Sequence, residues 1–137
     1  APARKTDLEM IDFVDYITPN EHECQELFPN LALEEILKKY SNRLIVTLGS
    51  EGVIFHDGET LQKIPAIKAK VVDTTGAGDT FNGAFAFGLT ENLSISDSIR
   101  LAVVASHLSI QKFGAQGGMP KLSEVKAKLK ELEINLY

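Results

Sequence analysis

The sequence has no tryptophan, only one cysteine and no long hydrophobic run among its 137 residues. The lone Cys24 cannot form an intrachain disulfide, which is typical of a protein from a reducing compartment, here predicted to be the cytoplasm. No apolar segment approaches the roughly 18–20 residues that a membrane-spanning helix requires. No run of Lys or Arg occurs, and the formal net charge is −5. These absences argue against a membrane-spanning protein and against general binding of nucleic acids or anionic membranes.

The sequence does have the composition of an ordinary globular domain. Hydrophobic residues make up 44% and charged residues 24%, and a chain of this length can bury a core of its own. The sequence begins with Ala1 rather than with methionine. We therefore expect it to be a piece of a longer protein.

Strand-like and helix-like spacings of apolar residues alternate along the chain. The β-prone run Leu44–Leu48 is typical of a strand buried on both faces, and the segment from Gly52 to Ile64 predicts a hairpin. Asn20 and Ser94 lie where helix N-caps are expected. Helices are predicted at 7–14, 20–28, 32–40, 79–89, 94–113 and 122–132, with a glycine-rich loop at 114–120. With no linker between these elements, we expect one α/β layer structure over residues 1–137.

The most informative segment is the glycine-rich stretch Val72–Ala84. Gly76 and Gly78 let backbone N–H groups converge at the start of a helix, where these groups lack internal partners and meet the positive end of the helix dipole. Such a nest suits an anion, above all phosphate. Asp79 is a carboxylate inside this nest, where it would repel the ligand unless it has a separate task, such as accepting a proton from an attacking hydroxyl.

Two other interpretations of the glycines have to be weighed. The small residues are also compatible with close packing of a helix on a sheet, and Asp79 with a plain carboxylate at a helix start. The residues alone leave this choice open. A dinucleotide-binding loop is disfavoured because Gly83 follows Gly78 too late for the G-x-G-x-x-G spacing. The G-x-x-x-x-G-K-[ST] pattern of a P-loop is also absent.

The segment Asp73–Ala84, with the sequence DTTGAGDTFNGA, resembles the C-terminal signature of the ribokinase-like (PfkB) family of carbohydrate and nucleoside kinases. Three further segments are similar to elements of that family and occur in the same order. They are the pair Asn20 and Glu23 after Thr18-Pro19, the strand and turn at 47–52, and the closing loop 114–116 with Pro120 after it.

The resemblance implies a role for each matching residue. Asp79 would be the base that takes the proton from the sugar hydroxyl attacking the γ-phosphate of ATP. The anion hole would be formed by the backbone N–H groups of Gly76, Ala77, Gly78 and Asp79. Asn20 and Glu23 would help to place the phosphates and Mg²⁺, with Glu23 acting through water. The nucleotide would be bordered by Thr47, Gly49, Gly52 and Val103, together with Gly78 and Asp79.

The resemblance also implies a monovalent-cation site, normally occupied by K⁺, that stiffens the loop carrying the anion hole. Its residues would be Asp73, Thr75, Ser109, Lys112, Gly114 and Gly118, most of them acting through backbone carbonyls. Val103 departs from the family pattern, in which Asn or His is common near adenine. Its side chain can pack on the base but cannot form a hydrogen bond with it.

The implied fold is ribokinase-like α/β, with a mostly parallel sheet flanked by helices and a hairpin excursion. By this resemblance, the N-terminal part that holds sugar-binding residues and the lid would be missing from the sequence. We therefore expect this chain alone to be inactive or nearly so. The longer parent is expected to phosphorylate a sugar, with ribose favoured, and to dimerise through the missing lid.

Alternatives to a ribose kinase remain open at this point. Fructose, a ketogluconate or a nucleoside could replace ribose as the substrate, because the residues that determine the substrate would lie mainly in the missing part. A different class is a nucleotide-binding module without chemistry.

Overall fold

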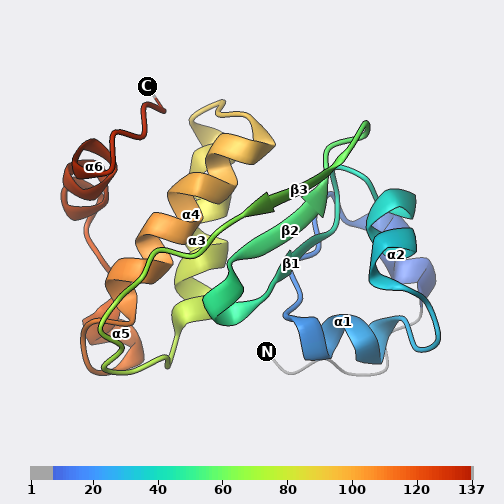
Figure 1. The fold of residues 1–137 in the computed structure, drawn as a ribbon, viewed down its shortest axis with the longest axis horizontal. Coiled ribbons are helices and arrows are strands. Elements are labelled where there is room, and N and C mark those ends of the chain that lie inside the picture. Colours follow the sequence, from blue (N-terminus) through green and yellow to red (C-terminus); the bar gives the residue numbers. More distant parts are fainter. Residues whose placement is uncertain (1–7, 137) are drawn as a thin grey trace. The chain divides into compact units, whose positions relative to one another are not determined.

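A computed structural model describes residues 8–136, and the chain divides into two compact units, one ending at Pro65 and one beginning at Ala66 (Figure 1). Each unit is described by itself below. The single layered domain expected over residues 1–137 stays a prediction.

The first unit combines short helices with a three-stranded sheet. Its elements are η1 (Leu8–Phe13), α1 (Glu21–Leu27), α2 (Leu33–Lys39), β1 (Ile45–Thr47), η2 (Gly49–Glu51), β2 (Val53–His56) and β3 (Leu61–Ile64). The strands lie in the order β1-β2-β3, and both pairs are antiparallel. Ile45 is opposite Phe55, and Val53 is opposite Ile64. The predicted hairpin is thus confirmed.

The pairing of these strands differs from the mostly parallel sheet that we expected. Within residues 8–136, parallel pairing is limited to two isolated bridges, Ile17 with Leu44 and Asn20 with Thr47. The reason lies in the connections, because a tight turn such as η2 can join only antiparallel neighbours.

The strand β1 and the residue before it form the centre of the first unit. Leu44, Ile45 and Val46 each have 0% of their surface exposed, which confirms the predicted burial on both faces. Leu44 and Val46 share a hydrophobic cluster with residues of α1 and α2 and their flanks, namely Cys24, Phe28, Ile36, Leu37 and Tyr40. Ile45 points to the opposite face, since successive side chains of a strand alternate. Burial raises the pKa of the Cys24 thiol.

The second unit is helical. It contains α3 (Ala77–Thr90), α4 (Ile95–Ser109), α5 (Ala115–Gly118) and α6 (Leu122–Glu131). Figure 1 shows α3 and α4 side by side, joined by a short turn. None of the helices within residues 8–136 has the length and apolar character needed to cross a membrane.

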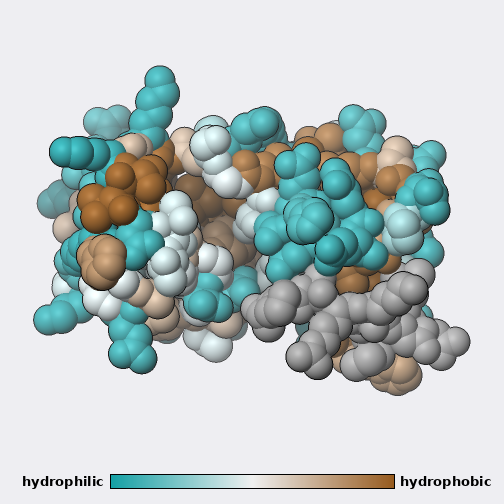
Figure 2. Space-filling model, turned by 90° about the horizontal axis from the view of Figure 1, so that it is seen from below, coloured by the Kyte–Doolittle hydropathy of each residue, from teal (hydrophilic) through white to brown (hydrophobic). Residues whose placement is uncertain are grey.

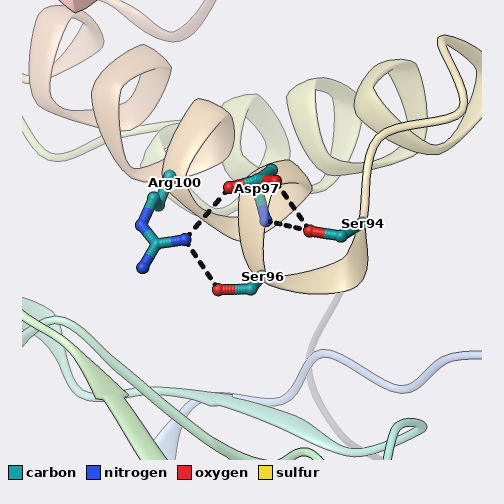
Figure 3. Close-up of polar contacts among 4 residues, drawn as sticks. All are labelled: Ser94, Ser96, Asp97 and Arg100. Carbon is teal, nitrogen blue, oxygen red and sulfur yellow. Dashed lines mark hydrogen bonds and ion pairs between the residues drawn. The ribbon is translucent and has the colours of Figure 1, made fainter. Parts of the chain in front are cut away.

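The start of α4 is fixed by a small network of polar side chains (Figure 3). Ser94 Oγ accepts a hydrogen bond from the Asp97 N–H at 3.1 Å and donates one to Asp97 Oδ2 at 2.8 Å. Arg100 Nη1 donates to Asp97 Oδ1 at 3.0 Å and to Ser96 Oγ at 2.9 Å. An N-cap of this kind contributes about 1 kcal/mol. The predicted cap at Ser94 is confirmed.

The end of α4 and the loop after it differ from the sequence-based expectation. We predicted a helix to Phe113, but α4 ends at Ser109. The next carbonyl, that of Ile110, accepts hydrogen bonds from the N–H groups of Val72 and Asp73 at 2.8 and 3.2 Å. The N–H groups of Gln111 and Lys112 donate to carbonyls only three residues back, those of Leu108 and Ser109, so α-helical bonding ends before the Ile110 carbonyl is used. The loop predicted at 114–120 contains the short helix α5.

Close packing of α3 on α4 depends on Gly88. A Cβ added to Gly88 would lie 2.8 Å from Ser98 Oγ and 2.9 Å from Ser98 Cα. We therefore expect Gly88→Ala to destabilise the chain by about 1–3 kcal/mol. The matched control is Gly83→Ala on the same helix, where an added Cβ meets nothing within 4 Å. This change should be neutral or stabilise by up to about 1 kcal/mol through helix propensity. Urea unfolding followed by circular dichroism measures both, and equal effects would contradict this packing.

Candidate active site

The residues singled out from the sequence fall into two groups, one in each unit. The first unit holds Asn20, Glu23, Thr47, Gly49 and Gly52. The second holds Asp73, Thr75, Gly76, Ala77, Gly78, Asp79, Val103, Ser109, Lys112, Gly114 and Gly118. The geometry within each group is described separately.

The helix α3 begins at Gly76, whose backbone is left-handed with φ 78°. The first hydrogen bond of the helix runs from the Thr80 N–H to the Gly76 carbonyl at 2.9 Å. The N–H groups of Gly78 and Asp79 have no backbone acceptor within residues 8–136, as is usual for the first turn of a helix. Ala77 is different, because its N–H donates to the Thr74 carbonyl at 3.1 Å. The two free donors of the first turn are therefore those of Gly78 and Asp79.

The side chain of Asp79 lies exposed in this first turn. The positive end of the helix dipole favours a negative charge there. The carboxylate is three residues beyond the N-cap, on the same turn as the two free N–H groups. A hydroxyl that approached an anion bound at these N–H groups would be within reach of a proton acceptor.

The two glycines of this loop have different structural requirements. A Cβ on Gly76 would lie 2.9 Å from Ala115 Cβ and 3.0 Å from Ala115 Cα, in addition to the strain of its positive φ. A Cβ on Gly78 would meet nothing within 4 Å. Packing thus explains Gly76 but not Gly78.

The carboxylate of Asp73 joins the loop before α3 to the loop before α5. Its Oδ1 accepts hydrogen bonds from Thr75 Oγ1 at 2.6 Å and from the Thr75 N–H at 2.9 Å. Its Oδ2 accepts one from the Gly114 N–H at 2.9 Å. These bonds lower the pKa of Asp73, and the bond from the Thr75 hydroxyl has the largest effect. The structure therefore brings together three of the residues predicted for a cation site.

The other predicted cation-site residues lie at the end of α4 and around α5. The Ser109 carbonyl accepts a hydrogen bond from the Lys112 N–H at 3.3 Å. The same carbonyl is so close to Gly118 that a Cβ there would lie 2.8 Å from it. The Lys112 ammonium is turned toward Glu124, with Nζ 2.8 Å from Oε1, and this contact lowers the pKa of Glu124. The side chain of Lys112 is thus engaged with Glu124.

Several contacts that hold this loop were missed by the sequence analysis. Ser106 Oγ donates to the Ala77 carbonyl at 3.2 Å. The ring nitrogen Nδ1 of His107 lies 3.2 Å from the Ile67 carbonyl. These side chains tie α4 to the segment that leads into α3. A partly buried Ser or a buried His on a helix carries no sequence signal for such a task, which is why neither was predicted. Val103, which we predicted to border the base, is 8% exposed on the same helix.

In the first unit, Asn20 and Glu23 cap α1 reciprocally. Asn20 Oδ1 accepts from the Glu23 N–H at 2.8 Å, and Glu23 Oε2 accepts from the Asn20 N–H at 3.0 Å. This capping box gives both residues a structural role. The bonds leave the amide nitrogen of Asn20 and Oε1 of Glu23 for a ligand.

Thr47 lies next to Asn20, because the two residues form one of the parallel bridges and the Thr47 N–H donates to the Pro19 carbonyl at 3.0 Å. The turn after Thr47 contains Gly49 with φ 55° and Gly52 with φ 100°. The φ of Gly52 comes with ψ −130°, a combination that only glycine adopts readily. All five predicted residues of this unit thus lie around the ends of two adjacent segments.

The family of the chain follows from a comparison of its sequence with family models. The model described as pfkB family carbohydrate kinase matches residues 1–122. The chain belongs to this family. It is 99% identical over 137 residues to the ribokinase of Lactococcus lactis subsp. lactis (strain IL1403), of which it covers 46%.

Solved structures of pfkB-family relatives have the same fold. The ribokinase of Thermotoga maritima is 36% identical with a TM-score of 0.85, and the alignment covers 94% of this chain and 46% of that one. Arabidopsis thaliana ribokinase, solved with ribose and ATP, is 36% identical with a TM-score of 0.78, covering 90% and 43%. The ribokinase-like fold class is thereby confirmed. The chain spans less than half the length of these relatives.

The contrast between Gly76 and Gly78 in this pfkB-family chain is testable by stability alone. We expect Gly76→Ala to destabilise by about 1–2 kcal/mol or more, because alanine is strained at positive φ and would overlap Ala115. Gly78→Ala should be neutral or slightly stabilising, since it adds a helix former in open space. Thermal and urea unfolding of the two variants measures this. Equal destabilisation would mean that packing explains both glycines.

Proposed function

We propose that this chain is the nucleotide-binding and catalytic part of a kinase that transfers the γ-phosphoryl group of ATP to a hydroxyl of ribose. The observation that carries the proposal is the first turn of α3, where two free N–H groups stand beside the exposed carboxylate of Asp79. The near identity to the Lactococcus ribokinase supports ribose as the acceptor. Because such a kinase needs ATP, we propose that it works in the cytoplasm.

In the proposed reaction, Asp79 accepts the proton of the attacking sugar hydroxyl. The hydroxyl oxygen forms a bond to the γ-phosphorus, the bond from that phosphorus to the bridging oxygen breaks, and ADP leaves with the electron pair. The N–H groups of Gly78 and Asp79 stabilise the negative charge on the transferring group, and that of Gly76 would complete the hole. Phosphoryl transfer depends mostly on positioning and charge stabilisation, and this loop provides both.

Two metal ions are part of the proposal. Mg²⁺ usually takes one or two carboxylates together with phosphates and water. Glu23 fits this use with its second oxygen, and no group of three or more metal-binding side chains occurs in residues 8–136. When bound, Mg²⁺ neutralises phosphate charge. The oxygen donors around Asp73, Thr75 and Gly114 suit a hard cation, and K⁺ held there would stiffen the loop that carries the anion hole.

A second candidate function is nucleotide binding without chemistry by this chain alone. It is favoured by one observation, namely that the chain covers only 46% of the Lactococcus ribokinase. Fructose, a ketogluconate or a nucleoside remain alternative acceptors for the longer protein. Dimerisation of the longer protein through its lid stays a prediction.

The base role of Asp79 is tested by Asp79→Asn in the full-length ribokinase. The amide keeps the shape of the side chain but cannot take the proton. We expect kcat for ribose phosphorylation to fall by about 10²–10⁴-fold, whereas the KM for ATP changes little. The control is Glu91→Gln, which removes an exposed charge at the other end of α3. A near-normal kcat in Asp79→Asn would remove this residue from the base role.

The anion hole is tested by Gly78→Ala in the same full-length protein. A methyl group over the free N–H groups should hinder the approach of the phosphates, and we expect kcat/KM for ATP to fall at least about tenfold. Gly117→Ala is the control, because its Cβ also meets nothing within 4 Å and Gly117 is outside the predicted site. Unchanged kinetics in Gly78→Ala would leave the anion hole without support.

A further inference from the structure

Ser106 is a residue of α4 that contacts the first turn of α3. Its hydroxyl is partly buried and donates a hydrogen bond to the Ala77 carbonyl at 3.2 Å, although the two residues are 29 positions apart in the sequence. Ala77 immediately precedes Gly78, whose N–H group is one of the two free donors of this turn. The one hydroxyl proton of Ser106 is therefore used on the backbone of the candidate anion hole.

The Ala77 carbonyl and the Gly78 N–H belong to the same peptide group. Because this group is planar and trans, its C=O and N–H point in opposite directions and rotate together. A hydrogen bond that holds the carbonyl therefore also holds the direction in which the N–H points. The same bond polarises the peptide group, which makes the N–H a stronger donor. Ser106 can thus act on the Gly78 N–H without touching a ligand bound there.

Few local restraints act on the peptide group before Gly78. A glycine has no Cβ to restrict its φ angle, and a Cβ added to Gly78 would meet nothing within 4 Å. On the other side of Ala77, its N–H is held by the Thr74 carbonyl at 3.1 Å. Ser106 supplies the matching restraint on the Ala77 carbonyl from a separate helix. Since a carbonyl oxygen has two lone pairs, this contact does not compete with the hydrogen bonds of α3.

The side chains of the loop at 73–79 are short, as its sequence DTTGAGD shows. The space-filling view has near-white surface, the colour of residues of intermediate hydropathy such as Gly, Ser and Thr, between polar and apolar groups of the second unit on its left side (Figure 2). Short side chains leave backbone N–H groups accessible to a ligand. They also provide few contacts that set the direction of these groups, so contacts from other elements have to do so.

The helix α4 holds the Ser106 hydroxyl firmly. The Ser106 carbonyl accepts hydrogen bonds from the Ile110 N–H at 3.2 Å and from Ser109 Oγ at 2.8 Å, which fixes its backbone in the last turn of the helix. Nine of the fifteen residues of α4 are buried, and α3 packs closely on this helix at Gly88. A side chain on a packed helix is positioned more precisely than one on a loop.

We propose that Ser106 is a positioning residue for phosphoryl transfer. Its hydroxyl orients and polarises the Gly78 N–H, and this N–H in turn binds the transferring phosphoryl group. Ser106 itself does not touch the substrate. The proposal rests on the proposed function, because Ser106 has this task only where the Gly78 N–H is part of the anion hole.

The hydroxyl is removed by Ser106→Ala in the full-length ribokinase. We expect kcat for ribose phosphorylation to fall by about three- to tenfold, the effect of one lost hydrogen bond, whereas the KM values for ATP and ribose change little. Ser106→Thr keeps a hydroxyl and should retain most of kcat. Ser106→Val has the shape of the threonine variant without its hydroxyl, and it should resemble Ser106→Ala.

Ser98→Ala is the matched control, with the same substitution on the same helix. Ser98 is fully buried against Gly88 of α3, and its Oγ has no hydrogen-bond partner within residues 8–136. Its removal should leave kcat unchanged. A normal kcat in Ser106→Ala, or equal kcat values in the threonine and valine variants, would overturn the proposal.

A spectroscopic measurement separates the orientation of the Gly78 N–H from a general loosening of the two helices. Full-length ribokinase is labelled with ¹⁵N-glycine, and the Gly78 amide resonance is identified by its loss in Gly78→Ala. We expect this resonance to move in Ser106→Ala, because the peptide group is no longer polarised by the hydroxyl, while the Gly88 resonance stays in place. In Ser98→Ala the reverse is expected. An unmoved Gly78 resonance in Ser106→Ala, or equal shifts of both resonances, would overturn the proposal.

The two measurements distinguish a failure of this proposal from a failure of the proposed function, because the Gly78 resonance does not depend on turnover. An unsubstituted enzyme that does not phosphorylate ribose would refute the proposed function, and with it the role of Ser106 in transfer, even if the resonance moves in Ser106→Ala. Normal ribose phosphorylation together with an unmoved resonance would refute the positioning role alone.

Discussion

The arrangement of the candidate site in the second unit depends on the carboxylate of Asp73. Three hydrogen bonds to this one group connect the loop before α3 with Thr75 and with Gly114, 41 residues further along the chain. Hydrogen bonds to a charged acceptor are about twice as strong as those between neutral groups. The connection brings the loop before α5 close to Gly76, whose missing Cβ permits the contact with Ala115. The direction in which α3 begins follows from these two constraints.

Much of this arrangement could be predicted from short sequence signals. Caps at Asn20 and Ser94, the buried run around Ile45 and the hairpin after it depend on neighbours a few residues apart, and the structure has all of them. The contact of the end of α4 with the loop before α3 could not be predicted in this way, since the Ile110 carbonyl is used there by residues nearly 40 positions earlier. The antiparallel pairing of β1 was missed because a buried apolar run does not specify the direction of its partner.

The residue types of the site could be predicted, but the hydrogen bond that each residue makes could not. The resemblance implies the same role for the four N–H groups from Gly76 to Asp79. In the structure the N–H of Ala77 donates to the Thr74 carbonyl instead. Asn20 and Glu23 can be explained both as helix caps and as ligand-binding residues. Their reciprocal capping is sufficient to explain why an amide and a carboxylate lie three residues apart. A cap that leaves a carboxylate oxygen free is nevertheless compatible with a ligand, so the two roles do not exclude each other.

The net charge of −5 is a poor guide to the ligand of this protein. A count of charged side chains suggests that an anion such as ATP would be repelled. The proposed contacts to phosphate come from backbone N–H groups and from bound cations, and neither appears in the composition. Two of the acidic side chains singled out from the sequence have other contacts: Asp73 joins two loops of the second unit, and Glu23 caps a helix of the first unit. Asp79 is the exception, because its carboxylate is exposed beside the free donors. A negative charge in that position opposes phosphate binding but is favoured by the helix dipole, and the proposed role as a base would give it a task.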